Sequence, residues 1–131
     1  MSIALIILAA GKGTRMKSDL PKVLHHIAGA PMLVHAMKSG ATLDPAKTII
    51  VAGHGAEQVS DAAKAFDETA DVVLQTEQLG TAHAVAQAKE VLFDFDGDAL
   101  VLYGDTPFIN PKTLEHMTAA RLDHDVVVLG F

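Results

Sequence analysis

The sequence of 131 residues contains no cysteine. Without cysteine the chain has neither disulfide bonds nor thiolate chemistry, a composition typical of a reducing compartment, so we expect a cytoplasmic location. The chain also lacks an apolar run of the roughly 20 residues that a membrane span needs. Its first apolar stretch, Ile3 to Ala10, has no basic segment before it, as a targeting signal would. We therefore expect no membrane association.

Basic residues are in the minority, since ten Lys and Arg stand against sixteen Asp and Glu and the formal net charge is −6. Most of such a surface repels polyanions, so we expect no nucleic-acid partner. Residues 1–22 nevertheless hold four of the ten basic side chains and a single acid, Asp19. The four are Lys12, Arg15, Lys17 and Lys22. This cluster predicts a site for one small, multiply charged anion, and a solvated basic turn is the alternative.

No repeat, low-complexity tract or linker divides the chain, and its length suits one compact domain. Short β-branched runs alternate with segments of helical period. The expected strands are residues 3–8, 48–52, 72–75, 99–103 and 126–129; the expected helices are residues 31–43, 56–66, 81–92 and 111–122. The continuous apolarity of the strands predicts a parallel sheet buried on both faces. We therefore predict an α/β fold, a three-layer sandwich with ligands at the carboxyl ends of the strands.

The segment "AAGKGTRM" directly follows the first expected strand. It lacks the third glycine of a dinucleotide fingerprint and the spacing of a Walker A loop. Gly11 and Gly13 allow backbone N–H groups to turn toward an anion. Three side chains add a point charge, a hydroxyl group and a bidentate fork: Lys12, Thr14 and Arg15. The pattern predicts a phosphate-binding loop, with a purely structural turn as the alternative.

Three segments, in this order, resemble the motifs of a known family. "LAAGKGTRM" followed by "LPKVL" is similar to the signature loop of sugar-phosphate nucleotidyltransferases. "LQTEQLGTAHAV" and "LYGDTPFI" resemble one branch, the bifunctional N-acetylglucosamine-1-phosphate uridylyltransferase/glucosamine-1-phosphate acetyltransferases. The resemblance implies the Rossmann-like fold of nucleotide-diphospho-sugar transferases. It also implies transfer of UMP from UTP to N-acetylglucosamine-1-phosphate, which yields pyrophosphate and the cell-wall precursor UDP-N-acetylglucosamine.

The resemblance further implies a role for each motif residue. Arg15 and Lys22 would be catalytic, neutralising phosphate charge, and Asp105 would bind Mg²⁺. Tyr103 and Gly104 would lie at the sugar, although a core role is equally open for Tyr103. The nucleotide would be held by residues of the glycine loop and of the second motif: Leu8, Ala10, Gly11, Lys12, Gly13, Thr14, Gln75, Gly80 and Thr81. Among these, Gln75, Gly80 and Thr81 would contact uracil.

Members of this family are much longer than the present chain. The resemblance therefore implies that residues 1–131 are the nucleotide-binding part of a uridylyltransferase domain. The sugar-binding half, and an acetyltransferase domain through which full-length relatives form homotrimers, would lie outside this sequence. The implied substrates are UTP and N-acetylglucosamine-1-phosphate. Two alternatives stay open: a cytidylyl- or guanylyltransferase of the same fold, and a nucleotide-binding module without turnover.

Overall fold

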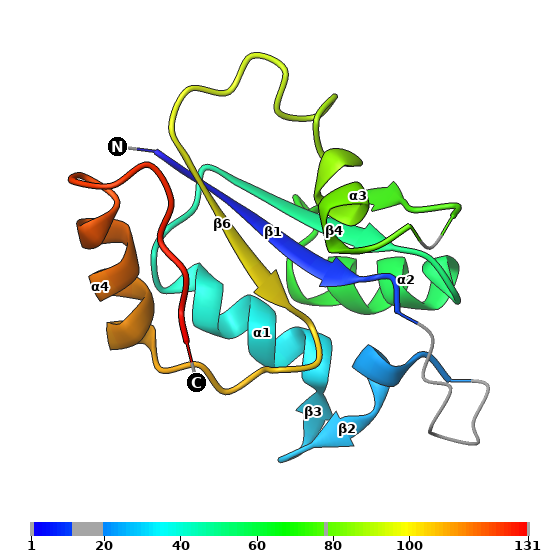
Figure 1. Cartoon of the computed structure of the whole chain (residues 1–131). Coiled ribbons are helices and arrows are strands. Elements are labelled where there is room, and N and C mark those ends of the chain that lie inside the picture. Colours follow the sequence, from blue (N-terminus) through cyan, green and yellow to red (C-terminus); the bar gives the residue numbers. More distant parts are fainter. Residues whose placement is uncertain (1, 12–19, 78, 131) are drawn as a thin grey trace.

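The computed structural model describes residues 2–11, 20–77 and 79–130. Its main sheet has four parallel strands in the order β5-β4-β1-β6 (Figure 1). The strands are β1 (Ile3–Ala9), β4 (Lys47–Ala52), β5 (Asp71–Leu74) and β6 (Asp98–Tyr103). Each of them lies within one residue of its predicted position. The parallel sheet expected from the apolar runs is therefore confirmed.

Helices cover both faces of this sheet. The helices are α1 (Met32–Ala41), α2 (Ala56–Phe66), α3 (Thr81–Ala86) and α4 (Pro111–Ala120). Buried residues of α1, α2 and α4 share one hydrophobic cluster, whereas Ala84 of α3 belongs to a second cluster on the opposite face. The predicted three-layer α/β sandwich is thus confirmed. No helix within the described ranges is long and apolar enough to cross a membrane.

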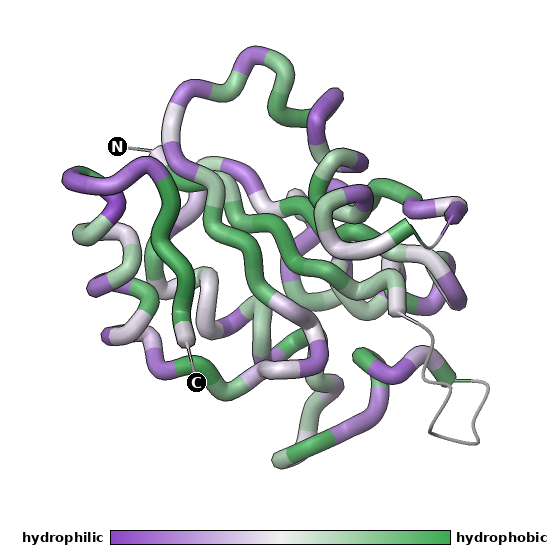
Figure 2. The backbone as a smooth tube through the Cα atoms, in the orientation of Figure 1, coloured by the Kyte–Doolittle hydropathy of each residue, from purple (hydrophilic) through white to green (hydrophobic). Residues whose placement is uncertain are grey.

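The central strand β1 supplies side chains to both clusters. Leu5 and Ile7 pack in the cluster with α1, α2 and α4, and Ile6 between them points into the cluster with α3. Successive side chains of a strand point to opposite faces, so a strand covered on both sides must be apolar throughout. Figure 2 shows the resulting hydrophobic centre, where the adjacent strands are the greenest part of the tube.

Two predicted elements differ from the structure. Residues 126–129 form no strand, and Val126 and Val128 are 77% and 82% exposed. Their β-branched side chains favour an extended backbone, but a strand also needs a neighbour to supply ladder hydrogen bonds, and β6 offers them none. The helix predicted for residues 81–92 ends at Ala86, because the next three backbone N–H groups bond three residues back and the chain continues as turns.

A short segment that the sequence did not predict connects β1 to α1. It contains the 3₁₀ turn η1 (Lys22–Leu24) and a small antiparallel hairpin of β2 (His26–Ile27) and β3 (Ala30–Pro31). Pro21, just before η1, is fully buried. Gly55, at the start of α2, faces it with φ +67°, and a Cβ atom there would lie 2.4 Å from Pro21 Cγ. The close approach of Pro21 to Gly55 places η1, and with it Lys22, beside α2.

We predict that Gly55→Ala destabilises the fold more than a glycine substitution at an open site. The new side chain would meet a left-handed backbone conformation, which costs about 1 to 2 kcal/mol. It would also overpack Pro21, at a further cost of about 1 to 3 kcal/mol. Gly29→Ala is the matched control, because Gly29 has φ +85° but no atom within 4 Å of the added Cβ. Urea unfolding measures both free energies, and equal losses would show that the contact with Pro21 is unimportant.

Candidate functional site

A cavity of about 310 Å³ opens at the carboxyl ends of the strands. It is lined by residues from β1 and its following loop, η1, the end of β5, α3 and the end of β6. They are Leu8, Ala10, Gly11, Lys22, Val23, Gln75, Gly80, Thr81, Ala84, Tyr103 and Asp105. All three sequence motifs therefore contribute to one cavity, as the sequence predicts.

The strand order explains why the cavity is there. From β1 the chain builds outward through β4 to β5, and then returns to the other side of β1 to form β6. The connections after β1 and after β6 consequently diverge, which leaves a crevice beyond the carboxyl ends of these two neighbouring strands. Figure 1 shows both strands ending on the side of the sheet where η1 lies.

An ion pair joins two of the predicted catalytic and metal-binding residues across this crevice. Lys22 Nζ in η1 donates to Asp105 Oδ2, just after β6, at 3.1 Å. Their side chains are 45% and 37% exposed, so water screens the attraction and the pair contributes about 0 to 1 kcal/mol to stability. The two charges are therefore placed at the cavity without being essential to the fold.

Gln75 is the one polar residue in the described ranges that is buried, with 4% of its surface exposed. Its backbone N–H donates to the carbonyl of Ala52 at 2.8 Å, which extends the ladder between β4 and β5 by one residue. Its side-chain amide nitrogen lies 3.2 Å from Gly80 O and 3.0 Å from His83 Nδ1. Gln75 is therefore a buried residue of the cavity wall and not an exposed surface residue.

Tyr103 and Gly104 differ in what they offer to a ligand. Tyr103 is 49% exposed and lines the cavity, so it has no core role. Gly104 is buried and its N–H donates to Leu8 O at 2.9 Å. A Cβ on Gly104 would lie 3.0 Å from Val23 Cγ1, so the small residue accommodates Val23. Contact of Gly104 with a sugar stays a prediction.

The remaining predicted residues of the glycine loop lie outside the described ranges: Lys12, Gly13, Thr14 and Arg15. The described end of that loop, Ala10 and Gly11, lines the cavity, and Thr81 is exposed at its margin. Sequence reasoning missed Val23 and Ala84 among the lining residues. It also missed His83, which contacts Gln75. Gln75 and His83 are eight positions apart within the second motif, which is not a helical spacing, so the contact between them is visible only in the fold.

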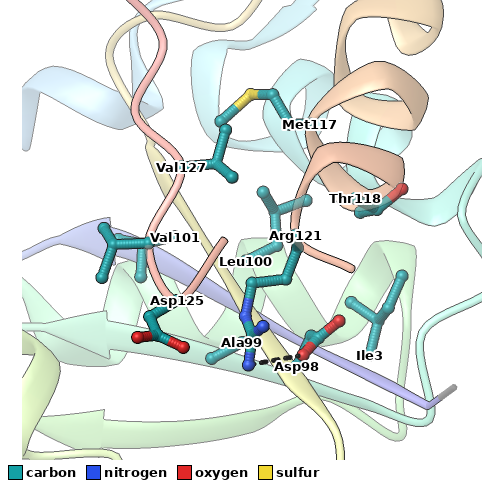
Figure 3. Close-up of a pocket in the computed structure, with 11 residues that line it drawn as sticks. Ile3, Asp98, Ala99, Leu100, Val101, Met117, Thr118, Arg121, Asp125 and Val127 are labelled. Atoms are coloured by element: carbon teal, nitrogen blue, oxygen red, sulfur yellow. Dashed lines mark ion pairs between the residues drawn. The ribbon is translucent and has the colours of Figure 1, made fainter. Parts of the chain in front are cut away.

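A second cavity, of about 280 Å³, lies at the open edge of β6 (Figure 3). Residues of β6, of α4 and of the segment 125–127 line it, and an ion pair of 3.4 Å joins Arg121 to Asp98. Except for these charges and Asp125, most of its labelled side chains are apolar, among them Leu100, Met117 and Val127. None of the predicted site residues lies in it, so the cavity at the strand ends is the functional candidate.

Comparison with known families agrees with this geometry. The model of the MobA-like NTP transferase domain matches residues 5–131, which is nearly the whole chain. The chain belongs to this family. The cavity of this MobA-like NTP transferase domain is formed by the same segments whose motifs suggested a nucleotidyltransferase.

One relative is similar to this chain over the chain's whole length. The chain is 72% identical over 131 residues to the Bifunctional protein GlmU of Ruegeria pomeroyi. The match covers 100% of this chain and 29% of the relative, so the chain spans less than a third of that protein's length. The resemblance to the bifunctional branch inferred from the three motifs is confirmed.

Solved structures share the fold of this MobA-like NTP transferase domain. Rv0371c from Mycobacterium tuberculosis H37Rv matches with a TM-score of 0.75 and 25% identity, over 92% of this chain and 60% of that one. Its complex with manganese matches with a TM-score of 0.69 and 24% identity, over 92% and 59%. A CMP:2-keto-3-deoxy-manno-octonic acid synthetase complexed with CTP matches with a TM-score of 0.69 and 25% identity, over 97% and 50%.

We predict that Lys22→Met changes the free energy of unfolding by less than about 1 kcal/mol, because its ion pair with Asp105 is exposed. Leu24→Ala, two residues along the same turn, is the contrasting variant. Leu24 is 6% exposed in the main hydrophobic cluster, so its truncation is expected to cost about 2 to 5 kcal/mol. Denaturant unfolding compares the two. A loss from Lys22→Met as large as that from Leu24→Ala would give the lysine a structural role.

Proposed function

We propose that this chain is the nucleotide-binding part of a uridylyltransferase domain that makes UDP-N-acetylglucosamine. In the proposed reaction the phosphate oxygen of N-acetylglucosamine-1-phosphate attacks the α-phosphorus of UTP, and the bond to the leaving pyrophosphate breaks. The observation that carries the proposal is the single cavity in which a basic group, an acidic group and a buried amide meet, contributed by Lys22, Asp105 and Gln75. The 72% identity to a GlmU protein supports this choice of substrates.

Lys22 is the cationic side chain among the described residues that line the cavity, and its charge suits two anionic substrates. Both substrates are anions, so bringing them together requires neutralisation and alignment more than covalent chemistry by the protein. Lys22 is placed by η1 at the cavity, where its ammonium group is proposed to contact the α-phosphate and the incoming sugar phosphate. Arg15 and Lys12, from the loop beyond Gly11, are proposed to hold the β- and γ-phosphates and the charge of the leaving pyrophosphate.

The acidic group of the cavity fits a divalent cation, and we propose Mg²⁺. Magnesium is usually bound through one or two carboxylates, substrate phosphates and waters, and Asp105 presents an accessible carboxylate beside the proposed phosphate position. No group of three His, Asp or Glu side chains that could hold a metal ion occurs in the described ranges. When bound, the ion would offset charge on the phosphates. Asp105 would hold it, and Lys22, now paired with Asp105, would be released toward the substrate.

The polar groups at the other end of the cavity are proposed to select the base. Gln75, Gly80 and Thr81 provide amide, backbone and hydroxyl groups on one side of the crevice. Fixed donors and acceptors discriminate between bases more strongly than apolar contacts, because a mismatched base leaves buried polar groups unpaired. Tyr103, half-exposed at the end of β6, is proposed to pack against the sugar.

The second substrate site, the oligomeric state and the location are proposed by analogy with the longer relatives. Groups that hold N-acetylglucosamine-1-phosphate and complete the metal site are proposed to lie outside residues 1–131, since the chain covers 29% of the GlmU relative. The homotrimer implied for full-length relatives concerns a domain that these residues do not include. The proposed location is the cytoplasm, where UTP is made and used. Cytidylyl transfer is the competing activity, because the similar synthetase structure contains CTP.

We predict that Mg²⁺ strengthens UTP binding to this chain and that Asp105→Asn removes most of that effect. The amide keeps the size of the side chain but loses the charge that a hard cation needs. Calorimetric titration with UTP, with Mg²⁺ and with EDTA, measures both proteins. Asp96→Asn is a suitable control, since that carboxylate belongs to an exposed residue outside the cavity lining. Unchanged dependence on Mg²⁺ in Asp105→Asn would remove Asp105 from the metal site.

We predict that the chain binds UTP but releases pyrophosphate at least about 300-fold more slowly than the full-length GlmU relative from Ruegeria pomeroyi. Positioning of the second substrate accounts for roughly 7 to 11 kcal/mol of a barrier, and loss of half of this explains the deficit. A coupled assay with UTP, Mg²⁺ and N-acetylglucosamine-1-phosphate measures both. Equal rates would show that residues 1–131 contain the whole transferase site. Absence of UTP binding would contradict the proposed function itself.

A further inference from the structure

We propose that His83 is a positioning residue that fixes the orientation of the Gln75 amide, so that Gln75 presents its carbonyl oxygen to the cavity and selects a base with a ring N–H. The inference rests on the proposed uridylyl transfer and assigns its base selection to a defined pair of side chains. His83 itself is not among the residues that line the cavity. It acts through Gln75, from the partly buried side of α3.

The hydrogen-bond partners determine which end of the Gln75 amide points inward. One terminal atom of this side chain lies 3.2 Å from Gly80 O and 3.0 Å from His83 Nδ1. A backbone carbonyl can only accept a hydrogen bond, so the atom next to it is the NH₂ group. That group has two hydrogens, and the second one is directed to His83 Nδ1. We therefore assign Nδ1 as the acceptor, with the ring proton on Nε2.

Among the described residues, the other end of the amide has no partner and is available to a ligand. Within residues 2–11, 20–77 and 79–130 no group bonds to Gln75 Oε1, and no side-chain nitrogen or oxygen there is both fully buried and unpaired. The 4% of Gln75 that remains accessible must then include Oε1, and the residue lines the cavity. Gln75 thus offers a buried, immobilised acceptor to whatever base occupies this end of the cavity.

His83 is itself held from the next turn of the chain. Gln87 Nε2 donates to His83 O at 2.9 Å and lies 3.3 Å from His83 Nε2. Both amides are anchored by a backbone carbonyl, Gln75 by Gly80 O and Gln87 by His83 O, and a ring with one proton cannot accept at both nitrogens. We assign the hydrogen bond to the shorter contact, at Nδ1. Ala84, the next residue, is buried in the cluster with Ile6 and Val51, which fixes the helix that carries His83 against the sheet.

This orientation distinguishes the two pyrimidines. The N3 atom of uracil carries a hydrogen and donates, whereas N3 of cytosine has a lone pair and accepts. If the Gln75 oxygen cannot rotate away, it accepts a hydrogen bond from N3 of uracil and repels the lone pair on N3 of cytosine. A freely rotating glutamine would match either base by exchanging its NH₂ and oxygen ends. The selection therefore depends on the group that prevents the exchange, and Gly80 O and His83 Nδ1 are those groups.

The experiment measures the dissociation constants of UTP and CTP, with Mg²⁺, for the unmodified chain and three substitutions. We expect His83→Leu, which has no acceptor, to lower the preference for UTP over CTP by about 2- to 10-fold, the value of one hydrogen bond. His83→Asn places an oxygen near the position of Nδ1 and is expected to restore the preference. Gln75→Leu is expected to lower it at least as far. Circular dichroism and thermal unfolding confirm that each variant folds.

The double variant separates positioning from a general structural effect. Because His83 acts through Gln75, adding His83→Leu to Gln75→Leu is expected to cause no further loss of preference. Additive losses, or an unchanged preference in His83→Leu, would overturn the inference. Equal binding of UTP and CTP by the unmodified chain would instead refute the proposed uridylyl specificity, which distinguishes the two failures.

A spectroscopic measurement tests the contact in the unmodified chain without ligand. The ¹⁵N chemical shifts of the His83 ring report which nitrogen carries the proton. We expect an unprotonated Nδ1 and a protonated Nε2 at neutral pH, together with a cross-peak between the Gln75 NH₂ group and the ring. A proton on Nδ1 would overturn the inference even if every variant failed to fold.

Discussion

The structure depends on the parallel pairing of β1 with β4 on one side and β6 on the other. β1 is covered on both faces as well, so water does not reach most of its backbone, and its N–H and C=O groups must be satisfied by the two ladders. Parallel pairing in turn brings the carboxyl ends of all four strands to one edge of the sheet. The loops after β1, β5 and β6 meet there, and the cavity follows from that arrangement.

The charged and polar side chains of the cavity differ in how strongly hydrogen bonds and burial restrain them. Lys22 and Asp105 are exposed at the rim and paired only with each other among described residues, so substrate or metal can rearrange them at small cost in stability. Gln75 is held by the end of the β4–β5 ladder, by Gly80 and by His83, so it is fixed before any ligand arrives. In the proposed reaction, exposed charges would suit phosphates that change, and a fixed amide would suit a base that does not.

The family and the activity rest on different observations. The MobA-like NTP transferase domain is shown by a match over nearly the whole chain, and the strand order agrees with it. The choice of UTP and N-acetylglucosamine-1-phosphate rests on the GlmU relative and on the polar groups of the cavity, because structures of similar fold include one that contains CTP. The arrangement at Gln75 is the part of the site where these two pyrimidine nucleotides would be distinguished.

The sequence by itself determined the strands of the sheet, the α/β class and most of the cavity lining. These follow from local patterns: continuous apolar runs, and motifs placed directly after them, whose meeting point is set by parallel pairing. It could not determine that residues 126–129 lack a strand partner, because ladder hydrogen bonds are made with distant residues. Nor could it show that Gly104 accommodates Val23, or that His83 meets Gln75. Those contacts depend on how separate parts of the chain pack, and only the tertiary structure decides which residues face one another.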